Sequence, residues 1–330
     1  MYPSLSLLQP GLIAGYLMIM ALLSMKYRTL QGTFKRLASH LSAAALAFFI
    51  SVACAAAQTP SDPRDPVQPS ELFAHVIAQQ KKSELELEQF ERIQRIESRK
   101  PGADSSAVET RAFRLFPNGT GLNKLPLSPE GITTDSAAYR AELEKLEKYL
   151  AWIVQDGSSQ RDAHARAERK RKERFDLIES THQAFDFTFQ GKETRGNRQL
   201  LRYAMAPRKD YKPTSRMTTL FTKVRGTIWV DEQTSQLAKV EGEVTDDISL
   251  ALFLARVNKG SHFMQERYEI APGVWEPTFE QYDFDGRRFF SSFSIHERTF
   301  YTGYKRVGPP RGSLPLIRSE LTKLSPDKKP

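Results

Sequence analysis

Residues 185–190 read Phe185-Asp186-Phe187-Thr188-Phe189-Gln190, and aromatic and polar side chains alternate along them. A period of two is that of a β-strand, and it places the three phenylalanine rings on one face. The alternation returns at residues 201–205, 227–231 and 237–244, with short turns between the segments rather than helices of crossover length. Successive strands joined in this way predict an antiparallel sheet with one buried face.

The last part of the sheet carries its strongest turn signal. Asp285 and Gly286 separate the aromatic segments 279–284 and 287–293. Because a type I′ turn needs positive φ at both of its central residues, this pair predicts a hairpin turn at these two positions. Gly226 is expected at an irregularity in an earlier strand.

The preceding part of the chain is predicted to contain both helix and strand. Ser70 can cap a helix whose apolar side chains fall on one face, at positions 72, 73, 76 and 77. Residues 84–98 fit a strand and a helix equally, since Leu85 and Leu87 alternate while later apolar residues step by three. Residues 113–119 read as a strand that runs into an Asn-Gly turn.

The clearest helix begins at Asp135 or Ser136. Its apolar side chains recur at steps of three and four and form one stripe: Tyr139, Leu143, Leu146, Leu150 and Ile153. This stripe fits a helix packed on the sheet, and it also fits a movable lid over a cavity. Gly157 is expected to end the helix, and residues 161–174 to continue as a highly charged, solvated helix.

A series of strand motifs surrounds the alternating segments. It comprises residues 185–190, 198–207, Arg225-Gly-Thr-Ile-Trp-Val-Asp231, residues 236–244, Asn258-Lys-Gly260, and Val274-Trp-Glu-Pro277 before the last hairpin. Over residues 175–307 this series resembles the outer-membrane lipoprotein-sorting (LolA/LolB-like) superfamily. The resemblance implies an α+β fold: a curved, incomplete antiparallel β-barrel with helices packed on or closing its concave face, around an apolar cavity for acyl chains.

The aromatic residues of the sheet have two interpretations. As core they pack against the helices, and as cavity lining they bind an acyl chain. The residues expected to line such a cavity are all aromatic and lie in predicted strands: Phe185, Phe187, Phe189, Trp229, Trp275 and Phe293. A cavity of roughly 300 Å³ or more lined by these rings would favour the second interpretation.

Residues 25–57 have the order of a secretory signal. Basic residues come first, an apolar run at 41–53 follows, and small residues lead to Ala57 before Gln58. Translation from Met25 and cleavage after Ala57 are expected. One alternative is a single transmembrane anchor, although the run is shorter than the roughly 20 apolar residues of a span. The other is a lipid-modified Cys54.

These signals divide the chain into four parts. They are a signal segment at 1–57, a proline-rich leader at 58–69, one LolA-like α+β domain at 70–307 and a basic disordered tail at 308–330. Within the domain, residues 128–180 form a helical insertion. Neither the insertion nor the tail belongs to the superfamily's usual pattern.

The residue types needed for several kinds of chemistry are missing. The only cysteine of the 330 residues, Cys54, lies in the signal, which excludes a disulfide framework, a multi-cysteine zinc site and thiol catalysis. The six histidines lack metal-binding spacing, and no nucleophile elbow or phosphate loop is present. Asp246 and Asp247 read as a turn. No catalytic residue, metal or cofactor is therefore expected.

The net charge of +9 does not indicate nucleic-acid binding. Basic side chains are concentrated in residues 161–174 and 305–330, and exported proteins seldom meet nucleic acid. The leading hypothesis is a non-enzymatic periplasmic carrier or sensor that binds an acyl chain or a lipoprotein and associates with the envelope membranes. The second is a structural or interaction module of the envelope without a ligand, and hydrolase activity has the least support.

Export is directly testable. If residues 25–57 are a cleaved signal, N-terminal sequencing of the mature protein should begin at Gln58. A chain that keeps Met1 or Met25 would indicate the membrane anchor. A chain that starts at a lipid-modified Cys54 would indicate a lipoprotein.

Overall fold

The computed structural model describes residues 69–99, 108–132, 136–215, 217–250, 255–288 and 291–324. The predicted signal segment and its alternatives lie outside these residues. In chain order the elements are α2 (Pro69–Leu87), β1 (Phe90–Arg99), β2 (Val108–Pro117), β3 (Leu122–Leu127), α3 (Ala137–Ile153), α4 (Ser158–Ala184), β4 (Phe185–Arg195), β5 (Arg198–Pro207), η1 (Thr218–Lys223), β6 (Val224–Asp231), β7 (Leu237–Val244), β8 (Ile248–Leu250), β9 (Ala255–Val257), β10 (His262–Ala271), β11 (Val274–Arg288), β12 (Ser291–Arg306) and α5 (Pro310–Leu324).

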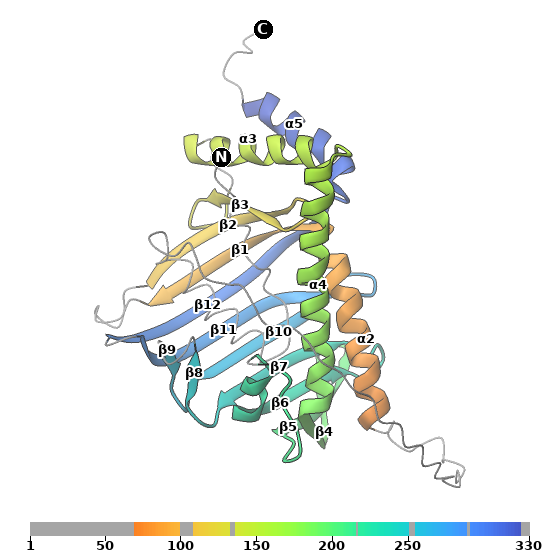
Figure 1. Cartoon of the computed structure of the whole chain (residues 1–330), viewed down its shortest axis with the longest axis vertical. Coiled ribbons are helices and arrows are strands. Elements are labelled where there is room, and N and C mark those ends of the chain that lie inside the picture. The colour runs from red at the N-terminus through yellow and green to blue at the C-terminus, as the bar shows by residue number, and fades with distance from the viewer. Residues whose placement is uncertain are drawn as a thin grey trace, which may run out of the picture.

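All the strands belong to one antiparallel sheet. Its order is β3-β2-β1-β12-β11-β10-β7-β6-β5-β4, and the short β8–β9 hairpin attaches to β11. Within the described residues β3 and β4 end this order and each has one neighbouring strand, so the sheet curves without closing (Figure 1). The predicted fold class, an α+β protein with an incomplete antiparallel barrel, is confirmed.

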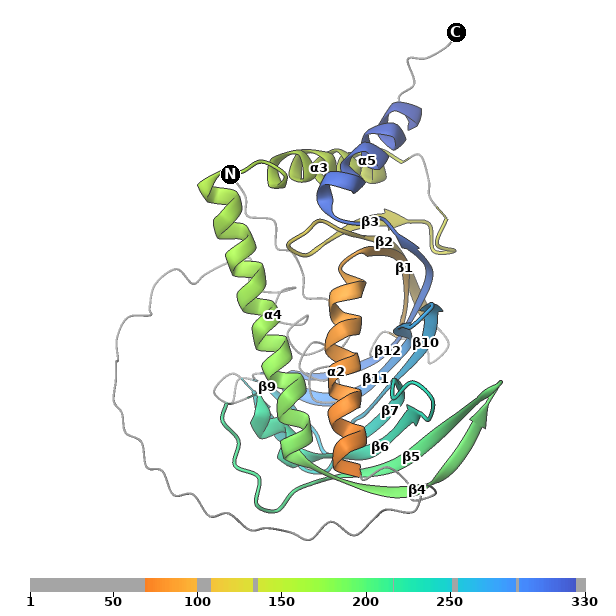
Figure 2. The same ribbon diagram turned by 90° about the vertical axis from the view of Figure 1, so that its right-hand side faces the viewer.

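Two helices cover the concave face of the sheet. Figure 2 shows α2 and α4 running side by side across its open side. The main apolar cluster fills the space between them and the strands, because alternate residues of the central strands point inward. In β7, for example, Val240 and Val244 are fully buried while Glu241 between them is exposed at its side chain.

Helices α3 and α5 form a second layer beside β3. Ser136 caps α3, since its hydroxyl accepts a hydrogen bond from the Tyr139 amide at 3.1 Å. The predicted stripe of α3 is buried, and it packs against β3 and α5. The helix therefore covers one end of the sheet and not its concave face.

The C-terminal stretch corrects one prediction. Residues 310–324 were expected in a disordered tail, but they form α5, with Leu314 and Ile317 buried against α3. Arg114 of β2 fixes this helix by donating to both oxygens of Glu320, at 2.9 and 2.7 Å. The basic residues between the apolar ones made this stretch look like a disordered tail in the sequence.

Helix boundaries also differ from expectation. α2 starts at Pro69, one residue before the predicted cap, and continues to Leu87, where the ambiguous segment changes from helix to strand. Gly157 does not end α3, which stops at Ile153; it is the residue before α4. The Asn118-Gly119 turn is confirmed, with Gly119 at φ +86°.

The predicted turn at Asp285-Gly286 is wrong. Both residues lie inside the β11–β12 ladder, opposite Ser294 and Phe293, and β11 continues to Arg288. Gly286 is required by space rather than by a turn: a Cβ there would lie 2.2 Å from the Arg256 carbonyl oxygen and 2.4 Å from the Phe293 ring. Gly226 likewise sits in regular pairing, and the register shift of its strand comes later, at Trp229 and Val230.

Replacing Gly286 by alanine should therefore destabilise the fold. We expect a loss of about 1–3 kcal/mol, because the backbone of β9 and the Phe293 ring must both shift. Gly312→Ala is the matched control, since a Cβ at this helical position meets nothing within 4 Å. Urea denaturation compares the two, and equal stabilities would contradict the close approach of β9.

Candidate functional site

The buried stripe of α2 changes chemistry along its length. Its first half presents Leu72, Phe73, Val76 and Ile77 to the interior, all less than 10% exposed. One and two turns further on, the same face presents the polar residues Gln80, Ser83 and Glu84, each 1–2% exposed. The concave face of the sheet therefore has an apolar half and a polar half.

Aromatic rings dominate the apolar half. Phe73 of α2 stacks on Phe187 of β4 with ring centroids 3.8 Å apart, and its edge meets Tyr203 of β5 at 5.2 Å. Phe189 also contacts Tyr203, at 5.4 Å, but is 45% exposed on the edge strand. The three rings of residues 185–189 thus run from the core at Phe185 to the rim of the concave face.

A small cavity remains where α2, α4 and the sheet meet. Its volume is about 30 Å³, room for little more than a water molecule. Ten residues line it: Phe73, Val76, Ile77, Thr181, His182, Phe187, Met205, Ile228, Leu237 and Val240. The two helices therefore fill most of the space that the open sheet would otherwise enclose.

The six predicted lining residues do not form one site. Phe185, Phe187 and Phe293 lie in or against the main interior cluster, and Phe189 lies at its rim. Trp229 and Trp275 instead form a separate cluster with Leu200 and Ala238. The Trp229 Nε1 donates a hydrogen bond to Glu193 at 2.8 Å, and the Arg198 guanidinium lies over the Trp275 ring.

The polar half contains charged residues that sequence reasoning missed. Arg92 of β1, Arg267 of β10, Glu84 of α2 and Glu276 of β11 are each at most 1% exposed. Arginine and glutamate are almost never buried without partners, so four such residues together mark an unusual interior. The sequence does place Arg92 on the same strand face as Gln94 and Ile96, two and four residues further on. Alternation alone did not show that this face lies in the interior.

Arg267 is held by several acceptors. Its Nη2 donates to the Trp275 carbonyl at 3.1 Å and lies 3.7 Å from the Glu276 carboxylate. The Gln80 amide faces it and, in the orientation that satisfies both groups, accepts from its two Nη atoms at 3.1 and 3.2 Å. The helix α2 therefore supplies part of the coordination of this buried cation.

Arg92 is not satisfied in this way. Neither of its Nη atoms has a hydrogen-bond partner within the described residues, and its guanidinium lies 5.8 Å from the centre of the Tyr301 ring. Both oxygens of Glu276 are also without hydrogen bonds among those residues. Glu84, Glu276 and Glu280 offset the charge of Arg92 electrostatically, but its buried Nη donors have no acceptor among the described residues, which is costly.

Burial controls the protonation of the acids. It raises the pKa of Glu84 to about 7, although Arg174, Arg267 and Arg92 oppose this effect. Burial also raises the pKa of Glu276 well above its usual range. These carboxyl groups therefore hold their protons more tightly than usual, and the arginines have less negative charge beside them than the residue count suggests.

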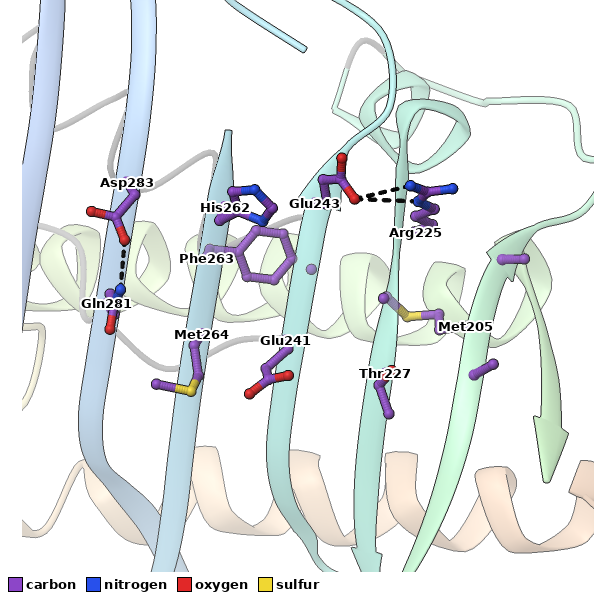
Figure 3. Close-up of a pocket in the computed structure, with 14 residues that line it drawn as sticks. Met205, Arg225, Thr227, Glu241, Glu243, His262, Phe263, Met264, Gln281 and Asp283 are labelled. Carbon is purple, nitrogen blue, oxygen red and sulfur yellow. Dashed lines mark hydrogen bonds and ion pairs between the residues drawn. The ribbon is translucent and has the colours of Figure 1, made fainter. Parts of the chain in front are cut away.

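A second concavity lies on the outer face. It has a volume of about 640 Å³, and Figure 3 shows α2 and α4 behind the strands that line it. Its outward side chains are mostly polar, with Arg225 paired to Glu243 and Gln281 donating to Asp283. This hollow lies on the outer face of the sheet, away from the aromatic cluster beneath α2.

Two negative findings apply to the described part of the chain. No group of three or more histidine, cysteine, aspartate or glutamate side chains there is arranged to hold a metal ion. No helix there is long and apolar enough to span a membrane.

The raised pKa of Glu84 predicts a pH-dependent stability. Its usual pKa is 4.5, so between about pH 4.5 and pH 7 the unfolded chain loses this proton while the folded chain keeps it. Rising pH should therefore lower the free energy of unfolding, by about 3 kcal/mol in total for this group, and the loss should persist above pH 7. The groups that face Glu84 are Arg174 of α4, Arg267, Arg92 and Glu88.

Urea denaturation of the wild type and Glu84→Gln at pH 4.5 and 7.5 tests this. The difference between the two proteins should change with pH in favour of the glutamine variant at pH 7.5. Glu71→Gln is the control, because Glu71 is exposed on the same helix. A pH-independent difference for Glu84→Gln would contradict the raised pKa of this buried carboxyl.

Comparison with known proteins gives structural likenesses only. No protein-family model and no curated protein matches the chain. A LolA superfamily protein from Nitrosomonas europaea is 10% identical and covers 73% of this chain and 94% of its own, with a TM-score of 0.29. A DUF1329 family protein from Desulfovibrio piger is 10% identical and covers 73% of this chain and 94% of its own, with a TM-score of 0.28.

A domain described as an outer membrane lipoprotein-sorting protein, from Vibrio parahaemolyticus, is 11% identical and covers 74% of this chain and 97% of its own, with a TM-score of 0.32. The first and third names are those of the superfamily that residues 175–307 resemble. At these TM-scores the superpositions are loose. The fold class is therefore assigned from the strand order and helix positions described above.

Proposed function

We propose that this chain is an exported, non-enzymatic protein of the cell envelope, working in the periplasm. It binds the acyl chain of a lipid or lipoprotein against the concave face of its sheet, as a carrier or sensor. One observation carries the proposal: the apolar first half of α2 lies on the aromatic concave face, where Phe73 stacks on Phe187. The helix occupies the place that an acyl chain would take.

Binding requires α2 to move. The cavity beneath it, about 30 Å³, is far smaller than the roughly 300 Å³ of a ligand pocket. The C-terminal end of α2 is anchored, because the Gln89 carbonyl that follows it accepts from the amides of Val307 and Gly308 at 2.9 and 3.2 Å. The whole of α2, including Gln80 and Glu84, can therefore swing outward about this end.

The exchange is energetically balanced. Each of the four apolar side chains that α2 buries contributes about 1.5–3 kcal/mol, which would be lost if the helix left and nothing replaced it. An acyl chain covers the same apolar surface, so most of the stabilisation of the sheet returns on binding. Phe189, exposed at the rim beside Tyr203, marks the side from which a chain would enter.

A structural or interaction module of the envelope is the second candidate. The observation in its favour is the same filled interior, which needs no ligand to be stable. The two functions differ in whether the wild-type protein accepts an acyl chain at all.

Titration with a fluorophore-labelled 12-carbon fatty acid separates them. The wild type should bind the probe, and Phe187→Asp should weaken binding tenfold or more, about 1.4 kcal/mol, because a carboxylate then faces the chain. Phe73→Ala should act in the opposite direction and tighten binding, since it weakens the contact of α2 with the sheet.

Phe300→Asp is the matched control. Phe300 alternates with the buried Thr299 and Tyr301 and pairs with Phe279 at 5.1 Å, so it faces away from the concave side. Circular dichroism checks that each variant is folded. Absence of probe binding by the wild type would favour the structural module.

A further inference from the structure

We infer that Arg92 and Arg267 form the binding site for the anionic headgroup of the amphiphile, and that α2 fills this site in the closed protein with Gln80 and Glu84. The inference rests on the proposed function and names its ligand class: a single molecule with an apolar chain and a phosphate or carboxylate head. The chain lies in the apolar half of the concave face and the head in the polar half.

The two arginines come from strands separated by β12 and β11, and both lie near Glu84 of α2. Arg92 belongs to β1 and Arg267 to β10, and each is 1% exposed. Both lie close enough to Glu84 to lower its pKa, as does Arg174 of α4, whose Nε is 3.9 Å from the Glu84 carboxylate. Glu84 is therefore surrounded by guanidinium groups from three elements, as a bound anion would be.

Gln80 and Glu84 of α2 satisfy the arginines less completely than a bound anion would. Arg92 keeps two Nη atoms without hydrogen bonds within the described residues, and the Gln80 oxygen that faces Arg267 carries no net charge. Arg174 is partly engaged elsewhere, since its Nη2 donates to Glu88 at 3.1 Å. A phosphate or carboxylate offers a full charge and oxygens for bidentate hydrogen bonds, which guanidinium groups bind best.

The distance between the aromatic cluster and the arginines also fits one amphiphile. Phe73 and Glu84 are eleven residues apart on one helix face, a separation of about 16 Å along its axis. An amphiphile lying in place of α2 would thus reach the aromatic cluster with its chain and the arginines with its head. The other buried carboxyl groups near the arginines, Glu276 and Glu280, compete less, because burial raises the pKa of each, and Glu280 already accepts hydrogen bonds from Gln265 and Tyr301.

Competition against the fluorescent fatty acid tests the inference. Dodecyl phosphate and dodecanol, both below the concentration at which they aggregate, have the same chain and differ in the head. The wild type should bind dodecyl phosphate at least tenfold more tightly. Arg92→Met and Arg267→Met should each reduce this preference to less than threefold while dodecanol binding stays unchanged.

Two further variants sharpen the result. At pH 8, above the raised pKa of Glu84 of about 7, Glu84→Gln should tighten dodecyl phosphate binding, because the internal competitor loses its charge. Arg95→Met is the matched control: Arg95 lies on the same strand, partly exposed, with its guanidinium over the Phe300 ring, and its loss should leave the preference intact. Arg92→Met should also remain folded, since methionine fills a similar volume and removes Nη atoms that have no hydrogen-bond partner within the described residues.

The outcomes are distinguishable. Equal binding of the two compounds by a wild type that still responds to Phe187→Asp would overturn the headgroup site and leave the proposed function standing. Displacement by neither compound would overturn both. Inorganic phosphate alone should displace the probe at least a hundredfold more weakly than dodecyl phosphate; comparable displacement would assign the arginines to a free anion instead of an amphiphile.

Discussion

The structure depends on one constraint: a curved sheet that does not close must have its concave face covered. Backbone hydrogen bonds hold the strands together, but they do not bury the aromatic and aliphatic side chains that alternate inward. Helices α2 and α4 bury them. Because both helices flank strands in the sequence, with α2 leading into β1 and α4 into β4, the chain covers its own sheet at little entropic cost.

The buried face of α2, one of the two helices on the concave side, changes from apolar to polar along its length. Along α2 the buried stripe passes from Phe73 and Ile77 to Gln80 and Glu84, and the sheet beneath changes with it. Burying Arg92 and Arg267 costs desolvation energy that apolar residues of the same volume would not cost. The half of α2 that contacts them is held by polar contacts that depend on protonation, while the other half is held by apolar burial alone.

Periodicity predicted much of this arrangement. The antiparallel strands, the stripe of α3 from Tyr139 to Ile153 and the common face of Phe185, Phe187 and Phe189 all follow from local spacing. Local spacing did not reveal that α5 folds back onto α3, or that Gly286 is small because β9 approaches it. It also did not place Trp229 and Trp275, because alternation defines two faces and long-range packing decides which one is inside.

An open sheet has a further consequence for how copies of the protein behave together. Each unpaired edge strand is a template on which another chain could add a strand, and a closed barrel avoids this. Here β3 is short, carries Pro126 and packs under α3. At the other edge, β4 has a register shift between Phe189 and Gly191, followed by the exposed Lys192. Both edges are thus poor templates, so the sheet can keep the opening that its cover helices need without polymerising edge to edge.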